Sequence, residues 1–412
     1  MPTAEPITAL AAAGDPAAAV AAADSLVALA LSRSPALAAL AAKIAAAREE
    51  APAAGALPDP MVGFSARGED YPGAGIGEDP MAMAAFEVAQ TLPWPGKRGR
   101  RQAAAAALVD VAEADLVAAR RRLAADTRTA YAEQAAIDAS RRSLLASLAL
   151  IDLLAPSLTA RYETGQAGQS DLIDLQLERL RLEGDLDDLD AKCDMHLAEL
   201  AAALDLPVAD LPPLDAGLPL IDGENATAVV PGDFAEVTVA ETRAAAAGLR
   251  AESARHEGSP DVFLGAEYGW RDALPPMVTA RVGVELPLWR SHKQDAEARA
   301  AGHEHAMAEA ERREALAMAG AEVASLRARF DASERQVVRL RTGILPQATL
   351  AAESARAGYA TGVAGADELI MALRRLAETG AMLVEREADR YAAWAALRAL
   401  AGRDPVLQEM RP

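Results

Sequence analysis

YETGQAGQSDLI, residues 162–173, and YATGVAGADELI, residues 359–370, align without a gap at an offset of 197. Seven of the twelve positions are identical, and both copies contain a glycine-bearing turn. A segment repeated at such a distance is typical of a duplicated structural unit. Each copy therefore predicts a helix-turn-helix tip, in which the glycine turn is followed by a helix of about 35 residues.

Very long helical stretches surround these tips. Residues 100–155 contain neither glycine nor proline, which predicts one helix that Pro156 interrupts. A second run over residues 290–342 is expected to end near Gly343 and Pro346. Between residues 182 and 204, leucines recur at spacings of four and three, which predicts a coiled-coil seam. Cys193 lies on this seam, so we expect it to fill the core.

Two segments upstream of the long helices predict β-hairpins, at about residues 58–94 and about residues 260–289. In residues 278–286 apolar and polar side chains alternate, which gives one apolar and one polar face. The apolar set is Val278, Ala280, Val282, Val284 and Leu286, and the polar set is Thr279, Arg281, Gly283 and Glu285.

The order helix, hairpin, long helix, tip, helix thus occurs twice. We predict a first repeat over residues 16–206, a linker rich in Pro, Gly and Asp over residues 207–232, and a second repeat over residues 233–404. The predicted fold class is mainly α with a small β part, in which long coiled-coil helices accompany four strands per chain.

Composition excludes several classes of function. The 412 residues carry a formal net charge of −20, which argues against a nucleic-acid partner because phosphate binding needs a basic face. A single cysteine excludes an internal disulfide and a cysteine-based metal cluster. Phosphate-binding loops, zinc-protease motifs and nucleophile elbows are absent from the sequence. We therefore predict no enzyme activity, no cofactor, no catalytic residue and no resident metal.

The hairpins are the expected membrane segments. No run approaches the ~18–20 continuous apolar residues of a membrane helix, whereas the strands have the length and alternation of transmembrane β-strands. Four strands cannot close a barrel, because the smallest have about eight, so other chains must supply the rest. Trp94 and Trp289, at the hairpin ends, are predicted to form an interfacial belt. The other aromatic residues of the hairpins are Phe64, Tyr71, Phe86, Phe263, Tyr268 and Trp270. The alternative is a water-soluble sandwich with an aromatic core.

Three other groups have weaker interpretations. The cations after the strands are expected either to meet anionic lipid headgroups or to form a solvated helix start; they are Lys97, Arg98, Arg100, Arg101, Arg290 and Lys293.

His303, Glu304 and His305 form a poor chelate on a helix, because residues two apart do not share a face. Met61, Met81 and Met83 fit packing better than copper(I) binding.

With these features in place, LPDPMVGFS (residues 57–65) and QTLPWPGKR (residues 90–98) resemble the TolC-type outer-membrane efflux proteins, closest to the heavy-metal cation branch. The resemblance covers residues 20–402. It implies a homotrimer in the outer membrane of a Gram-negative bacterium, with twelve strands closing one barrel above a periplasmic helical tunnel. Such proteins are the exit ducts of tripartite pumps, and their partners are a periplasmic adaptor, an inner-membrane transporter and outer-membrane lipid.

The resemblance also implies roles for the tips. Gly165, Gln166, Gly362 and Val363 are expected to dock the adaptor, because glycine lets another backbone approach closely. The alternative is that the glycines serve only the positive φ of their own turns.

The N-terminal stretch MPTAEPITALAAAGDP has no basic segment before an apolar one, so no signal peptide is visible in it.

A gate is the second expectation for the tips. Asp171, Asp174 and Glu368 would form an acidic ring that attracts cations, together with Tyr359. Met371 stands where a further carboxylate is typical, and Ala364 replaces an arginine of the family's gate network, which puts a lock between Tyr359 and Asp171 in question. The alternative for each acid is complementing a helix dipole. For the whole chain, the alternative is a soluble, elongated coiled-coil structural or adaptor protein.

Overall fold

The computed structural model describes residues 16–67, 82–214, 217–219, 221, 229–271 and 274–409. The chain forms two compact units. One comprises Met1–Ala38, Val117–Ala235 and Leu316–Pro412, and the other Ala39–Leu116 and Glu236–Ala315. Each unit takes segments from both halves of the sequence, so the units differ from the two predicted repeats, whose boundaries stay a prediction.

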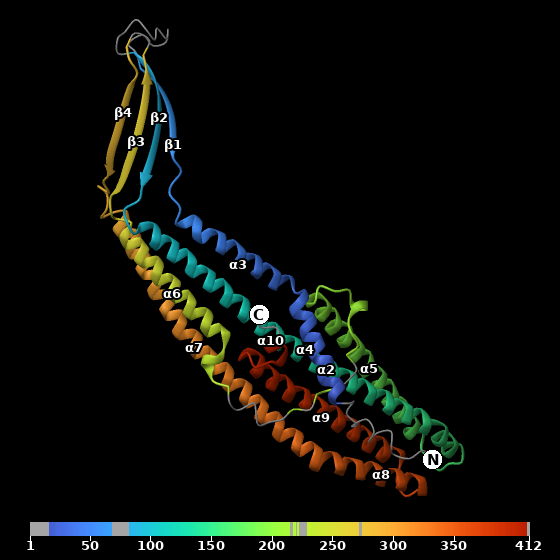
Figure 1. Cartoon of the computed structure of the whole chain (residues 1–412). Helices are drawn as coiled ribbons and strands as arrows, with labels where there is room; N and C mark the ends of the chain where they lie inside the picture. The colour runs from blue at the N-terminus through green and yellow to red at the C-terminus, as the bar shows by residue number, and fades with distance from the viewer. Residues whose placement is uncertain are drawn as a thin grey trace. The chain divides into compact units, whose positions relative to one another are not determined.

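The second unit contains a four-stranded antiparallel sheet in the order β1-β2-β3-β4 (Figure 1). Its strands are β1 (Met61–Arg67), β2 (Met83–Leu92), β3 (Asp261–Trp270) and β4 (Met277–Glu285). Phe86 of β2 pairs with Phe64 of β1 and with Tyr268 of β3, and Tyr268 pairs with Val278 of β4. The two predicted hairpins are therefore confirmed as neighbours in one sheet, joined by β2 and β3.

Helices complete this unit: most of α3 (Pro35–Ala54), α6 (Ala235–His256), and the first parts of α4 (Lys97–Glu163) and α7 (Gln294–Arg339). Small residues allow α4 and α6 to approach closely, as in the buried cluster of Ala107, Val111 and Ala246. The Asp115 carboxylate accepts hydrogen bonds from Lys43 (2.8 Å) and Arg243 (2.9 Å), which ties α3 and α6 to α4.

The first unit is helical. It contains α2 (Pro16–Arg33), the rest of α4 and α7, α5 (Gln169–Ala203), the π-helical turn η5 (Leu340–Ile344), α8 (Leu345–Thr361), α9 (Ala366–Leu400) and α10 (Pro405–Glu409). The fully buried Tyr131 packs with Leu26 and Leu204, and its hydroxyl donates to the Gly217 carbonyl oxygen at 2.8 Å.

The predicted linker packs onto this core in part, since Val208 and Val230 are exposed. It contains short 3-10 turns at Val208–Asp210 and Pro231–Asp233. Leu214 and Val229 are buried. The linker thus contributes to the core, because Leu214 is part of the cluster around Tyr131.

Both predicted helix ends were wrong. α4 continues through Pro156 to Glu163. A proline inside a helix removes one backbone hydrogen bond, but Ile151 and Leu158 on either side of it are buried in one cluster that holds the helix together. The second run does not end near Gly343, because η5 carries the helical path into α8. The π-helical turn places Pro346 in the first turn of α8, where its missing N–H costs nothing.

The predicted seam of α5 agrees with the structure, since Leu182, Leu200 and Leu204 are buried. Cys193 is half-buried, and its Sγ accepts a hydrogen bond from the Gln134 side chain at 3.2 Å.

Among the described helices, α4 contains an 18-residue window that is apolar enough to cross a membrane by composition, with a mean hydropathy of 1.7. α2 and α3 pass the same test only when taken together. The sequence-based prediction was that no uninterrupted run of apolar residues is long enough to cross a membrane. This window is apolar on average but is not an uninterrupted run. Long helices in protein cores pass such a test too, so it carries no further weight.

Candidate functional site

The sheet has an exposed apolar face. Side chains on it alternate along every strand with those of the other face, as the residues of β4 predicted. Val278 is 73% exposed and Val282 is 76% exposed. The other large exposed side chains on this face are Val62, Phe64, Phe86, Val88, Leu264, Tyr268, Trp270 and Val284. A sheet in water buries its apolar face, so this arrangement is the reverse of a soluble sandwich.

The opposite face is polar and rich in glycine. Glu87 and Glu267 are cross-strand partners on it, and Arg281 lies on the same face of β4. Glu267 is buried, and the Arg281 guanidinium pairs with both carboxylates. Sequence alternation predicted this face from β4 alone, but the cluster needs the register between β2 and β3, which no single segment reveals.

Two aromatic residues mark the ends of the hairpins. Trp94 is 44% exposed and Trp289 is 75% exposed, each beside the start of a long helix. Both therefore remain free to contact an interface, and their role as a belt stays a prediction. Tyr71 lies outside the described residues.

The basic cluster after β2 is largely occupied by partners from the same chain. Lys97 is buried, and its Nζ donates to Asp261 at 2.8 Å. The guanidinium of Arg101 forms two hydrogen bonds with the carboxylate of Glu257. Lys97 and Arg101 thus fix the strand-to-helix junction. Lys97 was expected either to meet lipid headgroups or to face solvent, and its buried ion pair fits neither expectation.

The two tips have the same backbone structure. Gly165 has φ of +73° and Gly362 has φ of +76°. In each turn an N–H reaches back five residues, from Gln166 to the Arg161 carbonyl and from Val363 to the Gly358 carbonyl. This is the Schellman motif, which requires the left-handed conformation that glycine adopts readily. The repeat thus predicted the tips correctly, and the positive φ supports the alternative explanation for the glycines.

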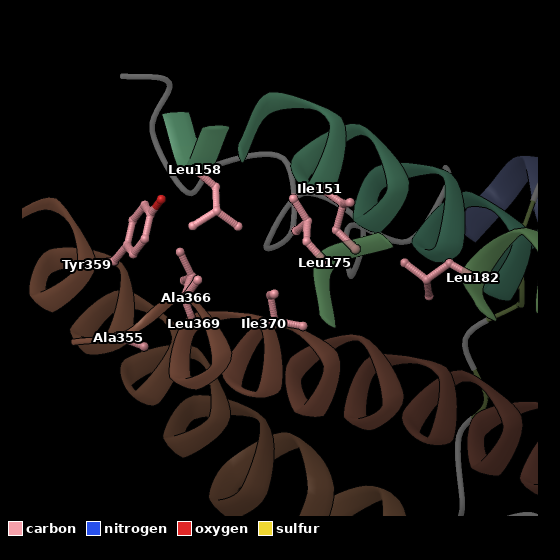
Figure 2. Close-up of a cluster of buried hydrophobic side chains, with 9 residues drawn as sticks. All are labelled: Ile151, Leu158, Leu175, Leu182, Ala355, Tyr359, Ala366, Leu369 and Ile370. Atoms are coloured by element: carbon pink, nitrogen blue, oxygen red, sulfur yellow. The ribbon is translucent and has the colours of Figure 1, made fainter. Parts of the chain in front are cut away.

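An apolar cluster joins the two tips. Leu158 of α4 and Leu175 of α5 point toward Tyr359 of α8 and Leu369 of α9 (Figure 2). Tyr359 is 4% exposed. Its hydroxyl has no hydrogen-bond partner among the described residues, so no lock with Asp171 forms in this structure.

The gate acids lie at helix N-termini. The Asp171 carboxylate accepts a hydrogen bond from the Gly168 backbone N–H at 3.0 Å, which caps α5. Glu368 occupies the matching third position of α9 and is exposed, as is Asp174. This contact supports the helix-dipole explanation for Asp171, while Glu368 and Asp174 face solvent.

Sequence reasoning missed three charged residues near the tips. The Arg161 guanidinium lies over the Tyr359 ring, and the buried Glu178 of α5 lies 3.7 Å from Arg374 of α9. Burial raises the pKa of Glu178, with nearby Arg374 opposing that rise. The sequence contained one signal for Arg161. Its equivalent in the second copy is Gly358, so the two copies differ at this position.

Among the described residues, no group of three or more His, Cys, Asp or Glu side chains is placed to hold a metal ion. His303 is exposed, and Glu304 pairs with Arg250 at 3.0 Å. Met61 is exposed on β1 whereas Met83 is buried, and Met81 lies outside the described residues.

An exposed apolar sheet joined to long helical hairpins is the fold of outer-membrane channel proteins. The chain belongs to the outer membrane efflux protein family, whose model matches residues 26–204 and 235–403. This membership assigns the protein to the outer membrane as an efflux component and disfavours a soluble coiled-coil protein.

Solved structures share the fold. The outer membrane protein VceC from Vibrio cholerae matches with a TM-score of 0.77 and 22% identity, over 93% of this chain and 97% of that chain. The open state of the Neisseria gonorrhoeae channel MtrE matches with a TM-score of 0.74 and 18% identity, over 92% and 89%. CusC matches with a TM-score of 0.76 and 17% identity, over 93% and 92%. No curated protein sequence matches the chain.

Proposed function

We propose that this protein is the exit duct of a tripartite efflux pump, in which three copies close one barrel around a central passage. The observation that carries the proposal is the apolar face of the sheet, which is exposed on every strand. Lipid satisfies such a face, and water fits the opposite face of Glu87, Glu267 and Arg281. Four strands per chain are too few for a barrel, so several chains must contribute.

The repeat supports an assembly of identical chains. Tyr359 and Ile370 of the second tip are buried against the first tip, whereas their equivalents Tyr162 and Ile173 are 43% and 47% exposed. In an assembly, the exposed first tip of one copy can pack on the second tip of a neighbouring copy, because the two tips have the same backbone structure. Head-to-tail contacts of this kind form a ring when the rotation from one copy to the next closes. Trimer is the ring size that the resemblance implies.

Lipid exposure of the sheet can be tested with spin labels placed one at a time from position 278 to position 284. In lipid bilayers, labels at Val278, Val282 and Val284 should be more accessible to oxygen, and labels at Thr279 and Gly283 to a water-soluble nickel chelate. Labels along β3 should show the same alternation between access to oxygen and access to the nickel chelate. Uniform access to the nickel chelate along the strand, in a protein that stays monodisperse without detergent, would overturn the duct.

We also propose that the tips dock a periplasmic adaptor. Gly165 and Gly362 support this role because a Cβ at either position would meet nothing within 4 Å, so the turn surface is open. Val363 is 87% exposed beside it. Trp at position 363 separates docking from folding, because residue 363 does not have the positive φ of Gly362. V363W should abolish cross-linking to the adaptor while V363A retains it. Normal cross-linking and efflux in V363W would exclude docking at this turn.

The acids Asp171, Asp174 and Glu368 are proposed to form the channel's inner ring. Glu368 and Asp174 support this role because both are exposed beside the turns. E368Q should reduce cation selectivity, whereas D171N should mainly weaken the α5 cap. Equal selectivity in E368Q and the unmodified channel would leave only the helix-dipole role.

Heavy-metal cations are the proposed cargo. The resemblance of residues 57–65 and 90–98 supports this class, as does the fold similarity to CusC. A deletion strain should become sensitive to heavy-metal salts and regain resistance with the intact gene. Unchanged metal tolerance together with new sensitivity to organic compounds would assign a different cargo.

A further inference from the structure

The polar face of the sheet carries an ion cluster that spans all four strands. One guanidinium nitrogen of Arg281 lies 2.9 Å from Glu87 on β2, although β3 separates the two strands. Its other nitrogen pairs with Glu267 on β3. Arg67 of β1 lies 3.8 Å from the same Glu267 carboxylate. All four strands thus contribute to one cluster.

The local sequence makes room for this reach. Gly265 is the cross-strand partner of Arg281. A Cβ at Gly265 would lie 3.4 Å from the Phe263 ring and 3.7 Å from the Arg281 Cβ. Glycine therefore leaves both larger side chains free to lie along this face, and the Arg281 side chain can extend toward β2.

The charges of the cluster cancel. Glu87 and Glu267 are directly opposite each other, and like charges in such positions repel. The Glu267 side chain is only 2% exposed, and Arg281 supplies the compensating charge to both acids. With Arg67 included, two cations balance two carboxylates. Removing Arg281 leaves an excess negative charge on each chain.

We propose that Arg281 sets the charge selectivity of the strand part of the duct by neutralising Glu87 and Glu267. The inference rests on the proposed function, since it requires this face to line the passage. Rings of charged side chains select ions by sign. Three copies without Arg281 would form an acidic ring, which attracts cations. The effect is largest at low salt, because screening is then weaker and the field of the ring extends farther.

Reversal potentials in planar bilayers test this role, using a potassium chloride gradient at low ionic strength. R281Q should raise the ratio of potassium to chloride permeability by about twofold or more. R281K keeps the charge and should stay near the unmodified value. The double variant E87Q and R281Q should also return toward it, since Arg67 and Glu267 then balance each other. R250Q removes one positive charge at an exposed position of α6, outside the sheet; it is the matched control and should change nothing.

The outcomes separate the two claims. An intact conductance with the same permeability ratio in R281Q and the unmodified channel would overturn the role of Arg281 but leave the duct standing. No conductance from the unmodified protein would overturn the duct itself. A shift in R281Q that persists in the double variant E87Q and R281Q would show that lost packing, not charge, changes the passage, and would also overturn the proposal.

Discussion

The guanidinium of Arg161 stacks on the ring of Tyr359, 4.3 Å from its centroid, and donates a hydrogen bond to the Tyr359 carbonyl oxygen at 2.6 Å. The contact joins the end of α4 to α8, and hence the first tip to the second. It occurs once in the chain, because the repeat has Gly358 where a second Arg161 would stand. The duplicated tips are therefore alike in backbone and different in side-chain contacts.

Replacing Arg161 should loosen the contact between the tips. R161M loses a cation–π interaction of about 0.5–2 kcal/mol and a charge-assisted hydrogen bond. We expect a lower midpoint of thermal unfolding in detergent and a larger open fraction in single-channel records. R141M, which removes an exposed pair with Asp190, is the control and should change neither quantity noticeably. Equal effects of the two substitutions would contradict a specific role for Arg161.

The buried pair of Arg128 and Asp404 should contribute strongly to stability. Their side chains are 6% and 2% exposed, and Asp404 lies just before α10. D404N leaves Arg128 with less compensating charge, and breaking a buried pair costs about 3–5 kcal/mol. Chemical unfolding in detergent measures the loss. D152N breaks the exposed pair with Arg179 and should have little effect. A similar midpoint for both variants would contradict the assignment.

Glu178 should make stability depend on pH. Burial raises its pKa above the ordinary value, and Glu378 and Asp185 add to the rise while Arg374 opposes it. The folded state then holds the proton more tightly than the unfolded state, so this contribution is present at low pH and is lost as pH rises through the raised pKa.

E178Q mimics the protonated acid and tests this direction. The variant should be more stable than the unmodified protein at about pH 8, and the difference should shrink toward about pH 4. S140A, a substitution on the facing side of α4, introduces no titrating group and should give a constant difference. A gain in stability for E178Q that grows toward low pH would show the opposite sign.

The exposed face of the first tip should control assembly. Ile173 is 47% exposed, whereas its equivalent Ile370 is buried in the same chain. I173D should therefore shift the protein from its oligomer toward smaller species in light scattering of detergent complexes. Leu350 is the control, because both it and its equivalent Leu153 are exposed, at 65% and 55%. L350D should leave the oligomer intact, and dissociation by L350D alone would contradict the repeat-based interface.

Local patterns predicted the parts of the structure that depend on local rules. Glycine spacing determined both Schellman turns, and alternation in residues 278–286 gave the faces of β4, because these features follow from backbone geometry. The helix ends failed at Pro156 and Pro346, where packing of Ile151 and Leu158 or a π-helical turn overrides the local signal.

The charged contacts were beyond the sequence for a different reason. Lys97 with Asp261, and Arg281 with Glu87, join residues more than 160 positions apart, so only the strand register brings them together. Their partners determine whether a basic residue faces lipid, solvent or a carboxylate. The sequence therefore showed that residues 97–101 are basic, but it did not show which carboxylates they pair with.

Conductance of the purified, detergent-solubilised protein in a planar lipid bilayer tests the central claim most directly. A duct predicts discrete, long-lived steps of uniform size that appear without any added transporter and shift toward lower cation selectivity in E368Q. A protein that associates with the bilayer yet gives no steps over the whole voltage range, in preparations where the oligomer is intact, would contradict the account.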